Sequence, residues 1–384
     1  MAGWPIFEIV TVYTSRGSAF ARSSLLAYML LITYASGFPF SGWRETGISP
    51  LAYLYAPLPR YWTAFDVTTN VIGYIPLGLL VVFALYPRVQ GRRAVWLSIV
   101  AGTLLSAIME AMQTYIPSRV PSNLDLITNV SGTCLGALAG LYLVPSFLAQ
   151  GRIQRLGQRW FRPEASGLLI VLALWPLAQI YPQSYLFGNG EITSVLSSWL
   201  SSLASEKIDL GDLLRQALHT NIAQPWQFWL SETLITACGM TGASLMLLCQ
   251  LRKTAPRSRL VLLFLLSAVV IKSLAIALIF APDNAFAWLT PGAFGGLLIG
   301  VMMVSGLVYS PAKVQRHLAA VTLFLGMAIV NFVPANHYFI ATLQTWSQGK
   351  FLNFNGVAQM LAICWPLLAL WLLLLPSKEM WGGE

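Results

Sequence analysis

The chain has 384 residues, of which 57% are hydrophobic and only 10% are charged, and its mean hydropathy is +0.67. A soluble protein carries about 25% charged residues, so this composition excludes an ordinary soluble domain and predicts a polytopic membrane protein. The net charge of +9 would suit nucleic-acid binding in a soluble protein. Here the charge lies in loops between apolar runs, where it sets topology, so no nucleic-acid partner is predicted.

Ten apolar runs are long enough to cross a membrane, because a membrane helix needs about 17–25 predominantly apolar residues. No obvious small-residue cleavage site follows the first run, so it is expected to remain as an uncleaved span. The runs cover residues 24–40, 68–86, 95–116, 126–148, 166–182, 227–250, 259–281, 285–309, 316–334 and 356–375. They predict an all-α integral membrane protein, a polytopic bundle of about ten transmembrane helices within the lipid bilayer.

The loops between these runs alternate in basic charge. One set of loops is rich in arginine and lysine, as at Arg92, Arg155 and Arg257, whereas the other set carries few basic residues. Basic loops stay on the cytoplasmic side of a membrane. Both the N-terminus and the C-terminus are therefore expected in the cytoplasm.

Three parts are expected along the chain. Residues 1–150 hold four spans, residues 151–226 hold the fifth span and a long extracytoplasmic loop, and residues 227–384 hold five further spans. Within the loop, apolar side chains follow helical spacing at Ile192, Val195, Leu196, Trp199, Leu200 and Leu203. This pattern predicts an interfacial helix, either as a surface connection between two halves or as a lid over an outward-facing site.

A short motif occurs twice, at the start of the second run and of the fourth. Asp66-Val-Thr-Thr-Asn-Val-Ile-Gly73 returns as Asp125-Leu-Ile-Thr-Asn-Val-Ser-Gly132. Each copy places a carboxylate and a carboxamide four residues apart, and hence on one face of a helix. Hydrocarbon does not tolerate such groups without partners. The repeat therefore predicts one site built from two similar helices.

The third run adds two polar residues at the same depth. Glu110 and Gln113 are three residues apart and share a helix face. At a rise of 1.5 Å per residue, Glu110 lies roughly 9 Å below the outer end of its helix. A cluster near the outer leaflet is therefore expected from Asp66, Asn70, Glu110, Gln113, Arg119, Asp125 and Asn129.

Two functional interpretations of this cluster stand beside a structural one. In a catalytic site, Glu110 would transfer protons, with Asp66 and Asp125 as further catalytic carboxylates. Arg119 would bind a phosphate or carboxylate, and the substrate-binding set would also include Asn70, Gln113 and Asn129. Carboxylate and carboxamide oxygens also suit a divalent cation, Mg²⁺ or Ca²⁺. A lipid-linked glycan or a peptidoglycan precursor fits such a site at that depth.

The other interpretations need no chemistry. No Ser, Cys or His is expected in the cluster, so it can serve as a binding pocket for an envelope lipid or a partner protein. In the structural alternative, Asp66 and Asp125 pair with Arg60 and Arg119, or cap their helices at the positive end of the helix dipole. A secondary transporter is a third functional class, although the cluster lies near one surface and not at the midplane.

The pattern of these residues resembles the VanZ-like family over residues 24–148. The resemblance rests on Asn70-x-x-x-Tyr-Ile-Pro-Leu-Gly78, Glu110-x-x-Gln113, Pro-x-Arg119 and Asp125-x-x-x-Asn129-x-x-Gly132-x-x-x-Gly136. It implies a four-helix domain in the bacterial inner membrane and a role in cell-envelope or exopolysaccharide processes. The family is named for a protein linked to teicoplanin resistance, so antibiotic resistance is also implied, but no biochemical activity is.

The second half offers two weaker patterns. Lys272 lies in the middle of the run 259–281, and it is expected to pair with Glu232 in the run before it, because an unpaired lysine at that depth is costly. Gln344 and Lys350 repeat the spacing of Gln113 and Arg119, and Asn353 and Asn355 follow them, which suggests a degenerate copy of the first half.

Overall fold

The computed structural model describes residues 6–38, 40, 42–148, 151–162, 166–204, 206–219, 222, 224–279, 282–334 and 352–375. Within these ranges the secondary structure is helical and no strand is formed. Seven of the described helices are long and apolar enough to cross a membrane. The prediction of an all-helical, multi-pass membrane protein is therefore confirmed.

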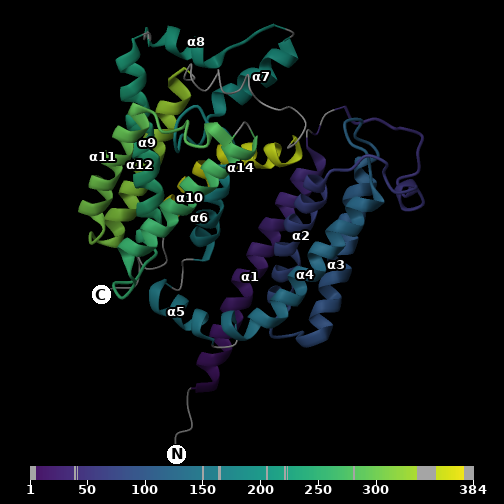
Figure 1. The fold of residues 1–384 in the computed structure, drawn as a ribbon. Helices are drawn as coiled ribbons and strands as arrows, with labels where there is room; N and C mark the ends of the chain where they lie inside the picture. Colours follow the sequence, from purple (N-terminus) through teal and green to yellow (C-terminus); the bar gives the residue numbers. More distant parts are fainter. Residues whose placement is uncertain are drawn as a thin grey trace, which may run out of the picture. The chain divides into compact units, whose positions relative to one another are not determined.

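The chain forms two compact units, Met1–Arg159 and Trp160–Glu384. Unit 1 contains four long helices that run alongside one another (Figure 1). They are α1 (Ile6–Gly37), α2 (Ala64–Leu85), α3 (Gly91–Gln113) and α4 (Asn123–Phe147). A short 3₁₀ turn, η1 (Ala52–Leu54), lies in the loop after α1, and α5 (Arg152–Trp160) follows α4.

Helices α2 and α4 begin three to four residues earlier than their apolar runs, because polar residues cap them. The hydroxyl of Thr63 accepts the backbone N–H of Asp66 at 3.1 Å, and the hydroxyl of Ser122 accepts those of Leu124 and Asp125 at 3.1 and 3.3 Å. Capping hydroxyls satisfy N–H groups that have no partner within the helix. The caps place both copies of the repeated motif in the first turns of their helices.

Glycines let α2 and α4 pack with their backbones in contact. A Cβ atom at Gly132 would collide with the carbonyl of Val71, and one at Gly136 with the carbonyl of Ile75. A Cβ atom at Gly78 on α2 would likewise collide with the backbone carbonyl of Thr133 on α4. Small residues permit this close approach in membrane helices, where van der Waals packing and interhelical hydrogen bonds drive association. The close packing holds the two motif copies side by side.

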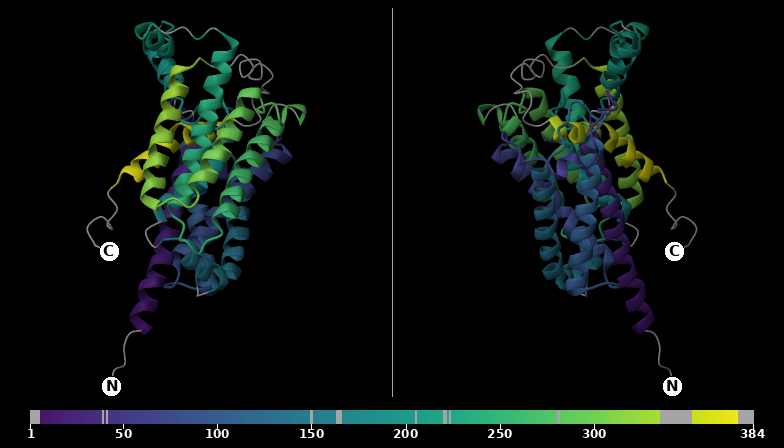
Figure 2. Two further views of the ribbon diagram at one scale, coloured as in Figure 1. Left: turned by 90° about the vertical axis from the view of Figure 1, so that its left-hand side faces the viewer. Right: turned by 90° about the vertical axis from the view of Figure 1, so that its right-hand side faces the viewer.

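Unit 2 is built around α9, whose inner half is almost wholly buried. Helices α11 and α12 pack along it, as the side views show (Figure 2). The helices of unit 2 are α6 (Ser166–Ala178), α7 (Ile192–Ala204), α8 (Leu210–Ala217), α9 (Pro225–Leu248), α10 (Arg257–Ile279), α11 (Pro291–Leu307), α12 (Ala312–Phe332) and α14 (Leu352–Leu374). Gly296 gives the same close approach here, since a Cβ atom on it would meet Thr236.

Helix α6 is shorter than the run 166–182 predicts. Its last helical residue is Ala178, two residues after Pro176, and the chain then continues without regular structure to Ile192. Residues 179–182 of this irregular segment, 179–190, were expected within the fifth span, and the residues from 183 onward were expected in a polar extracytoplasmic loop. Instead most of it is buried within unit 2, where Tyr185 is 2% exposed and Phe187 is 3% exposed.

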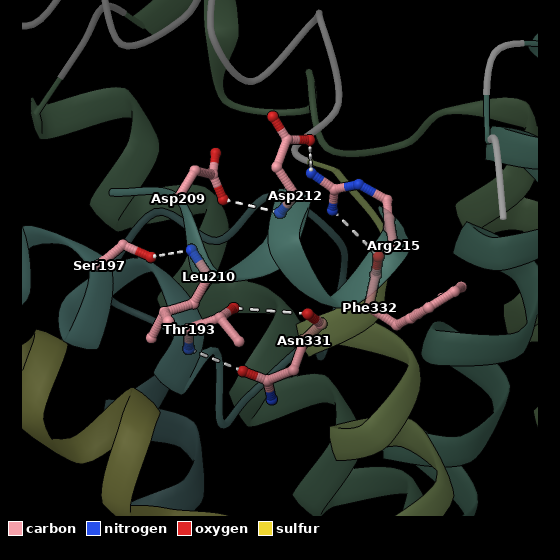
Figure 3. A network of polar contacts seen from close by, with 8 residues as sticks. All are labelled: Thr193, Ser197, Asp209, Leu210, Asp212, Arg215, Asn331 and Phe332. Carbon is pink, nitrogen blue, oxygen red and sulfur yellow. Dashed lines mark hydrogen bonds and ion pairs between the residues drawn. The ribbon is translucent and has the colours of Figure 1, made fainter. Parts of the chain in front are cut away.

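The helix expected over 192–203 is present as α7, and it pairs with α8 in a hairpin tied to the end of α12 (Figure 3). The side-chain oxygen of Asn331 accepts the N–H groups of Ile192 and Thr193 at 2.7 and 2.9 Å. Arg215 donates to the carbonyl of Phe332 at 3.1 Å and pairs with Asp212 at 2.6 Å. These contacts fix the hairpin at one end of the unit 2 bundle.

The predicted pair of Lys272 and Glu232 is wrong. Among the described residues the ammonium of Lys272 has no hydrogen-bond partner, and Glu232 instead interacts with the side chain of Thr290 and packs against Gly292 at the start of α11. The two helices, α9 and α10, follow each other in the sequence and were therefore expected to be neighbours. Their order in the chain does not determine which side chains face each other. The suggested second copy around Gln344 and Lys350 lies outside the described residues.

Candidate functional site

The buried carboxylate of Glu110 is the centre of a polar cluster in unit 1. Glu110 lies in the last turn of α3 and is 4% exposed. One of its oxygens accepts the backbone N–H of Ser122 at 2.8 Å, just before α4 begins. This hydrogen bond holds the carboxyl group against the start of the neighbouring helix. Glu110 therefore connects α3 to the turn that carries the second motif copy.

The two motif copies meet through Asp125 of the second and Asn70 of the first. Their side chains lie close enough to interact, and both residues are half-buried. The carboxylate of Asp125 also lies close enough to those of Glu110 and Asp66 to interact with them electrostatically. The structure therefore brings together three acids from three helices, as the sequence predicts. The contact across copies requires the close packing of α2 and α4 described above.

Asn129, the carboxamide of the second copy, points into the helix packing and not toward Asp125. Its amide donates to the hydroxyl of Ser106 at 3.0 Å, and its own oxygen is buried without a partner. The hydroxyl of Tyr74 on α2 also interacts with Ser106. Asn129, Ser106 and Tyr74 thus form the inner floor of the cluster.

Asp66, the first acid of the repeat, occupies a different environment from Asp125. Its side chain is exposed and accepts the hydroxyl of Thr63 at 2.6 Å, within its own helix start. An acid in the first turn also favours the positive end of the helix dipole. The helix-capping interpretation therefore accounts for Asp66, and neither Arg60 nor Arg119 forms an ion pair with either aspartate in the part of the chain that the structure describes.

Arg119 and Gln113 hold the end of α1. The guanidinium of Arg119 donates to the carbonyl of Phe38 at 2.6 and 3.1 Å and to that of Ala35 at 3.0 Å. Gln113 donates to the carbonyl of Ser36 at 3.2 Å. Burial lowers the pKa of Arg119 to about 10, opposed by the carboxylates of Glu110 and Asp125, which leaves the side chain charged at neutral pH.

The hydrogen bonds of Arg119 limit how it can bind an anionic ligand. Three of its N–H donors are committed to carbonyls at the end of α1, so only the Nη1 edge remains for an anion among the contacts of the described residues. Bidentate recognition through the opposite edge is blocked. Arg119 acts first as the clamp that places α1 beside the acids.

The chemistry of the cluster is that of a buried, acid-rich polar site with a single neighbouring cation. Such a site can accept protons, bind hydroxyl and amine groups, or hold a cation between carboxylate and carboxamide oxygens. No group of three His, Cys, Asp or Glu side chains suited to a metal forms within the described residues. A cation would therefore need the Asn70 or Asn129 oxygens in addition to Asp125.

Three residues of the polar cluster, Ser106, Tyr74 and Ser122, were not predicted from the sequence. Helical spacing could have identified the first two. Ser106 lies four residues before Glu110, and Tyr74 lies four residues after Asn70, so each shares a helix face with a residue of the predicted set. The expectation that no serine belongs to the cluster was wrong. Ser122 contributes its backbone N–H, which no side-chain pattern signals.

Comparison with known proteins supports the resemblance that the sequence suggests. Residues 16–144 match the family model described as VanZ/LLP1. Among curated proteins and among solved structures, none matches the chain. The family match runs from within α1 almost to the end of α4, and it covers every residue of the polar cluster. The stretch 16–144, which carries this site, is therefore VanZ-like.

Proposed function

We propose that the polar cluster of unit 1 is an outward-facing pocket that acts on the polar part of a lipid-linked glycan or peptidoglycan precursor. The observation that carries the proposal is Glu110, a 4% exposed carboxyl group held by one backbone N–H beside the carboxylate of Asp125. A carboxylate at membrane depth is costly to bury, and such groups usually serve a function. The VanZ/LLP1 match supports a role in the cell envelope, including glycopeptide resistance.

In this proposal Glu110 accepts or donates the proton, and Asp125 stays ionised with Asn70 to bind hydroxyl groups or a divalent cation. Asp66, at the exposed rim, contacts the ligand from solvent. Asn129 and Gln113 shape the floor and wall of the pocket through their bonds to Ser106 and Ser36. Arg119 contributes its free edge to an anionic group while it clamps α1.

The proposed pocket requires a defined orientation of the protein in the membrane. Ten segments cross the bacterial inner membrane, and both termini lie in the cytoplasm, as the basic loops around Arg92, Arg155 and Arg257 suggest. The pocket then opens at the outer face, where lipid-linked precursors are displayed. Labelling of single introduced cysteines from either side of intact cells tests this arrangement.

A second candidate function is binding without turnover. It is favoured by Ser106, which lies one helical turn before Glu110 but is fully buried and hydrogen-bonded to Asn129. A pocket whose buried serine is engaged in this way suits recognition of a lipid or a scaffold role as well as acid–base chemistry.

The experiment compares Glu110→Gln and Asp125→Asn with Glu45→Gln, an exposed glutamate of the same unit. Teicoplanin susceptibility and exopolysaccharide yield are measured in cells that depend on the protein, at matched protein levels. The proposal expects loss of the phenotype in the first two variants and no change in the control. Purified wild type and Glu110→Gln are then assayed with a fluorescent lipid-linked precursor.

The outcomes separate the two functions. Product formation by wild type that is lost in Glu110→Gln, with precursor binding retained, supports catalysis. Binding without product in wild type, weakened in Asp125→Asn, supports the binder. Phenotypes that survive both substitutions would refute a functional role for the cluster.

A further inference from the structure

Lys272 is a buried basic residue in unit 2. It lies in α10, on the stripe that also buries Val261, Ala268 and Ala275, and it is 2% exposed. Within the part of the chain that the structure describes, its ammonium has no hydrogen-bond partner. Removing an ammonium from water is costly unless a counter-charge or several hydrogen bonds replace the lost hydration.

The described acids of unit 2 do not provide that counter-charge. Glu232 is occupied by Thr290 and Gly292, and Glu191 interacts with Ser184, with no electrostatic contribution from either to Lys272. A structural salt bridge therefore does not explain why a lysine stands at this position.

The position of Lys272 follows from two contacts between α6 and α10. Phe161 and Leu251 form an isolated bridge just before the two helices begin, so α6 and α10 start at the same end and run in parallel. Further along, the rings of Trp175 and Phe264 stack at 4.9 Å. Lys272 is two turns beyond Phe264, or roughly 12 Å, whereas α6 ends within one turn of Trp175. Lys272 therefore lies level with the irregular segment 179–190.

That segment carries further buried polar atoms without partners. They are the side-chain oxygens of Gln179 and Gln183 and the amide nitrogen of Asn189. Gln179 and Asn189 are held together by a 3.0 Å hydrogen bond and are 0% and 6% exposed. Non-helical backbone at membrane depth is tolerated where it is buried in protein or lines a cavity, and interrupted helices of this kind form ligand sites in membrane proteins.

We propose that Lys272 and the irregular segment 179–190 form a binding site for an anionic group, a carboxylate or a phosphate. The ammonium of Lys272 supplies the charge, and the unpartnered amide of Asn189 supplies a second donor. The oxygens of Gln179 and Gln183 accept hydroxyl groups of the same ligand. The site belongs to unit 2 alone, so it does not depend on the function proposed for the acids of unit 1.

The test uses the full-length protein purified in detergent, and it follows thermal unfolding with a thiol-reactive dye. Cys238 and Cys249 are free and buried, so they report unfolding of unit 2. The probes are inorganic phosphate, acetate and phosphatidylglycerol, with chloride at equal ionic strength and phosphatidylcholine as references. Saturation at about a hundred times the dissociation constant is expected to raise the unfolding temperature of wild type by about 5–10 °C.

Lys272→Met is expected to abolish this shift, and Lys207→Met, which removes an exposed lysine of the same unit, is expected to retain it. Without any probe, Lys272→Met is expected to unfold at a higher temperature than wild type, because it removes the uncompensated charge. A response to phosphate or acetate identifies a soluble anion, and a response to phosphatidylglycerol alone identifies a lipid headgroup. No response in wild type, or an equal response in Lys272→Met, would overturn the proposal.

A second variant keeps the test decisive if Lys272→Met does not fold. Gln179→Glu places a carboxylate in the segment level with Lys272 and should act as a built-in ligand. It is expected to raise the unfolding temperature without a probe and to remove the response to added anions. A Gln179→Glu protein that still responds like wild type contradicts the site.

Discussion

The guanidinium of Arg119 donates two hydrogen bonds, of 2.6 and 3.1 Å, to the carbonyl oxygen of Phe38. Phe38 follows α1, and its carbonyl has no partner within that helix. Arg119 therefore closes the helix end while it lies beside the acids of the polar cluster. The residue that looks like a phosphate ligand in the sequence is a structural clamp in the fold.

Arg119→Lys is expected to destabilise unit 1 although it keeps the charge. One ammonium cannot reproduce the planar fork that reaches Phe38 and Ala35 together, and the loss of one or two such bonds costs about 2–3 kcal/mol. Thermal unfolding in detergent measures the change, with the exposed Arg44→Lys as the matched control. Because the pKa of Arg119 lies below its ordinary value but still near 10, the loss should be constant below about pH 9. Equal stability of Arg119→Lys and wild type would argue against the clamp.

The repeated motif provides a paired test of packing, because its two glycines occupy unlike environments. A Cβ atom at Gly132 would strike the carbonyl of Val71, whereas one at Gly73 would meet nothing. Gly132→Ala is expected to destabilise the protein by about 1–3 kcal/mol, as overpacking does. Gly73→Ala should be neutral or stabilising by up to about 1 kcal/mol, because alanine favours a helix. The unfolding temperatures of the two variants, measured in detergent, test this difference. Similar values for both variants would contradict the close contact between α2 and α4.

The hairpin of α7 and α8 should loosen when Asn331 is removed. Asn331 accepts the N–H group of Thr193 (Figure 3) and that of Ile192 at the start of α7, and it donates to the carbonyl of Gly190 at 2.6 Å. Asn331→Leu leaves these groups unpaired, and tryptic cleavage at Lys207 is expected to accelerate about ten-fold, the effect of about 1.4 kcal/mol on local opening. Ser202→Ala, which alters an exposed hydroxyl of α7, should leave the rate unchanged. Unaltered cleavage in Asn331→Leu would mean that other contacts hold the hairpin.

Hydropathy predicted helices α2, α3 and α4 of unit 1 well, whereas α1 begins at Ile6, far before the predicted run 24–40. The apolar runs of α2, α3 and α4 lie within a few residues of the observed helices, and the shift comes from polar caps such as Thr63 and Ser122. The polar residues were expected at one level, and Asp125 does lie close to both Glu110 and Asn70. The rotation of each helix about its axis was not predictable in this way. That rotation turns Asn129 toward Ser106 and leaves Asp66 at the surface.

The errors in unit 2 have a common physical origin. Hydropathy treats an apolar stretch as one continuous helix, but α6 ends at Ala178, two residues after Pro176. The residues that follow are packed against α9 and α14 without being helical. Likewise, charge pairing was inferred from neighbouring runs, although Glu232 faces the start of α11, where Gly292 leaves room for it. Both features depend on contacts between segments far apart in the chain.

The shortness of α6 has a consequence for how the protein is made. Thirteen residues of helix extend roughly 20 Å, less than the hydrocarbon core of about 30 Å, so α6 is a poor autonomous insertion signal. One of its carbonyls, on Val171, is held by the indole N–H of Trp365 at 2.7 Å, a residue 194 positions later in the chain. The intervening residues must therefore be synthesised before this hydrogen bond can form. The position of α6 within unit 2 is thus fixed only after α14 has been made, so α14 stabilises α6 late in assembly.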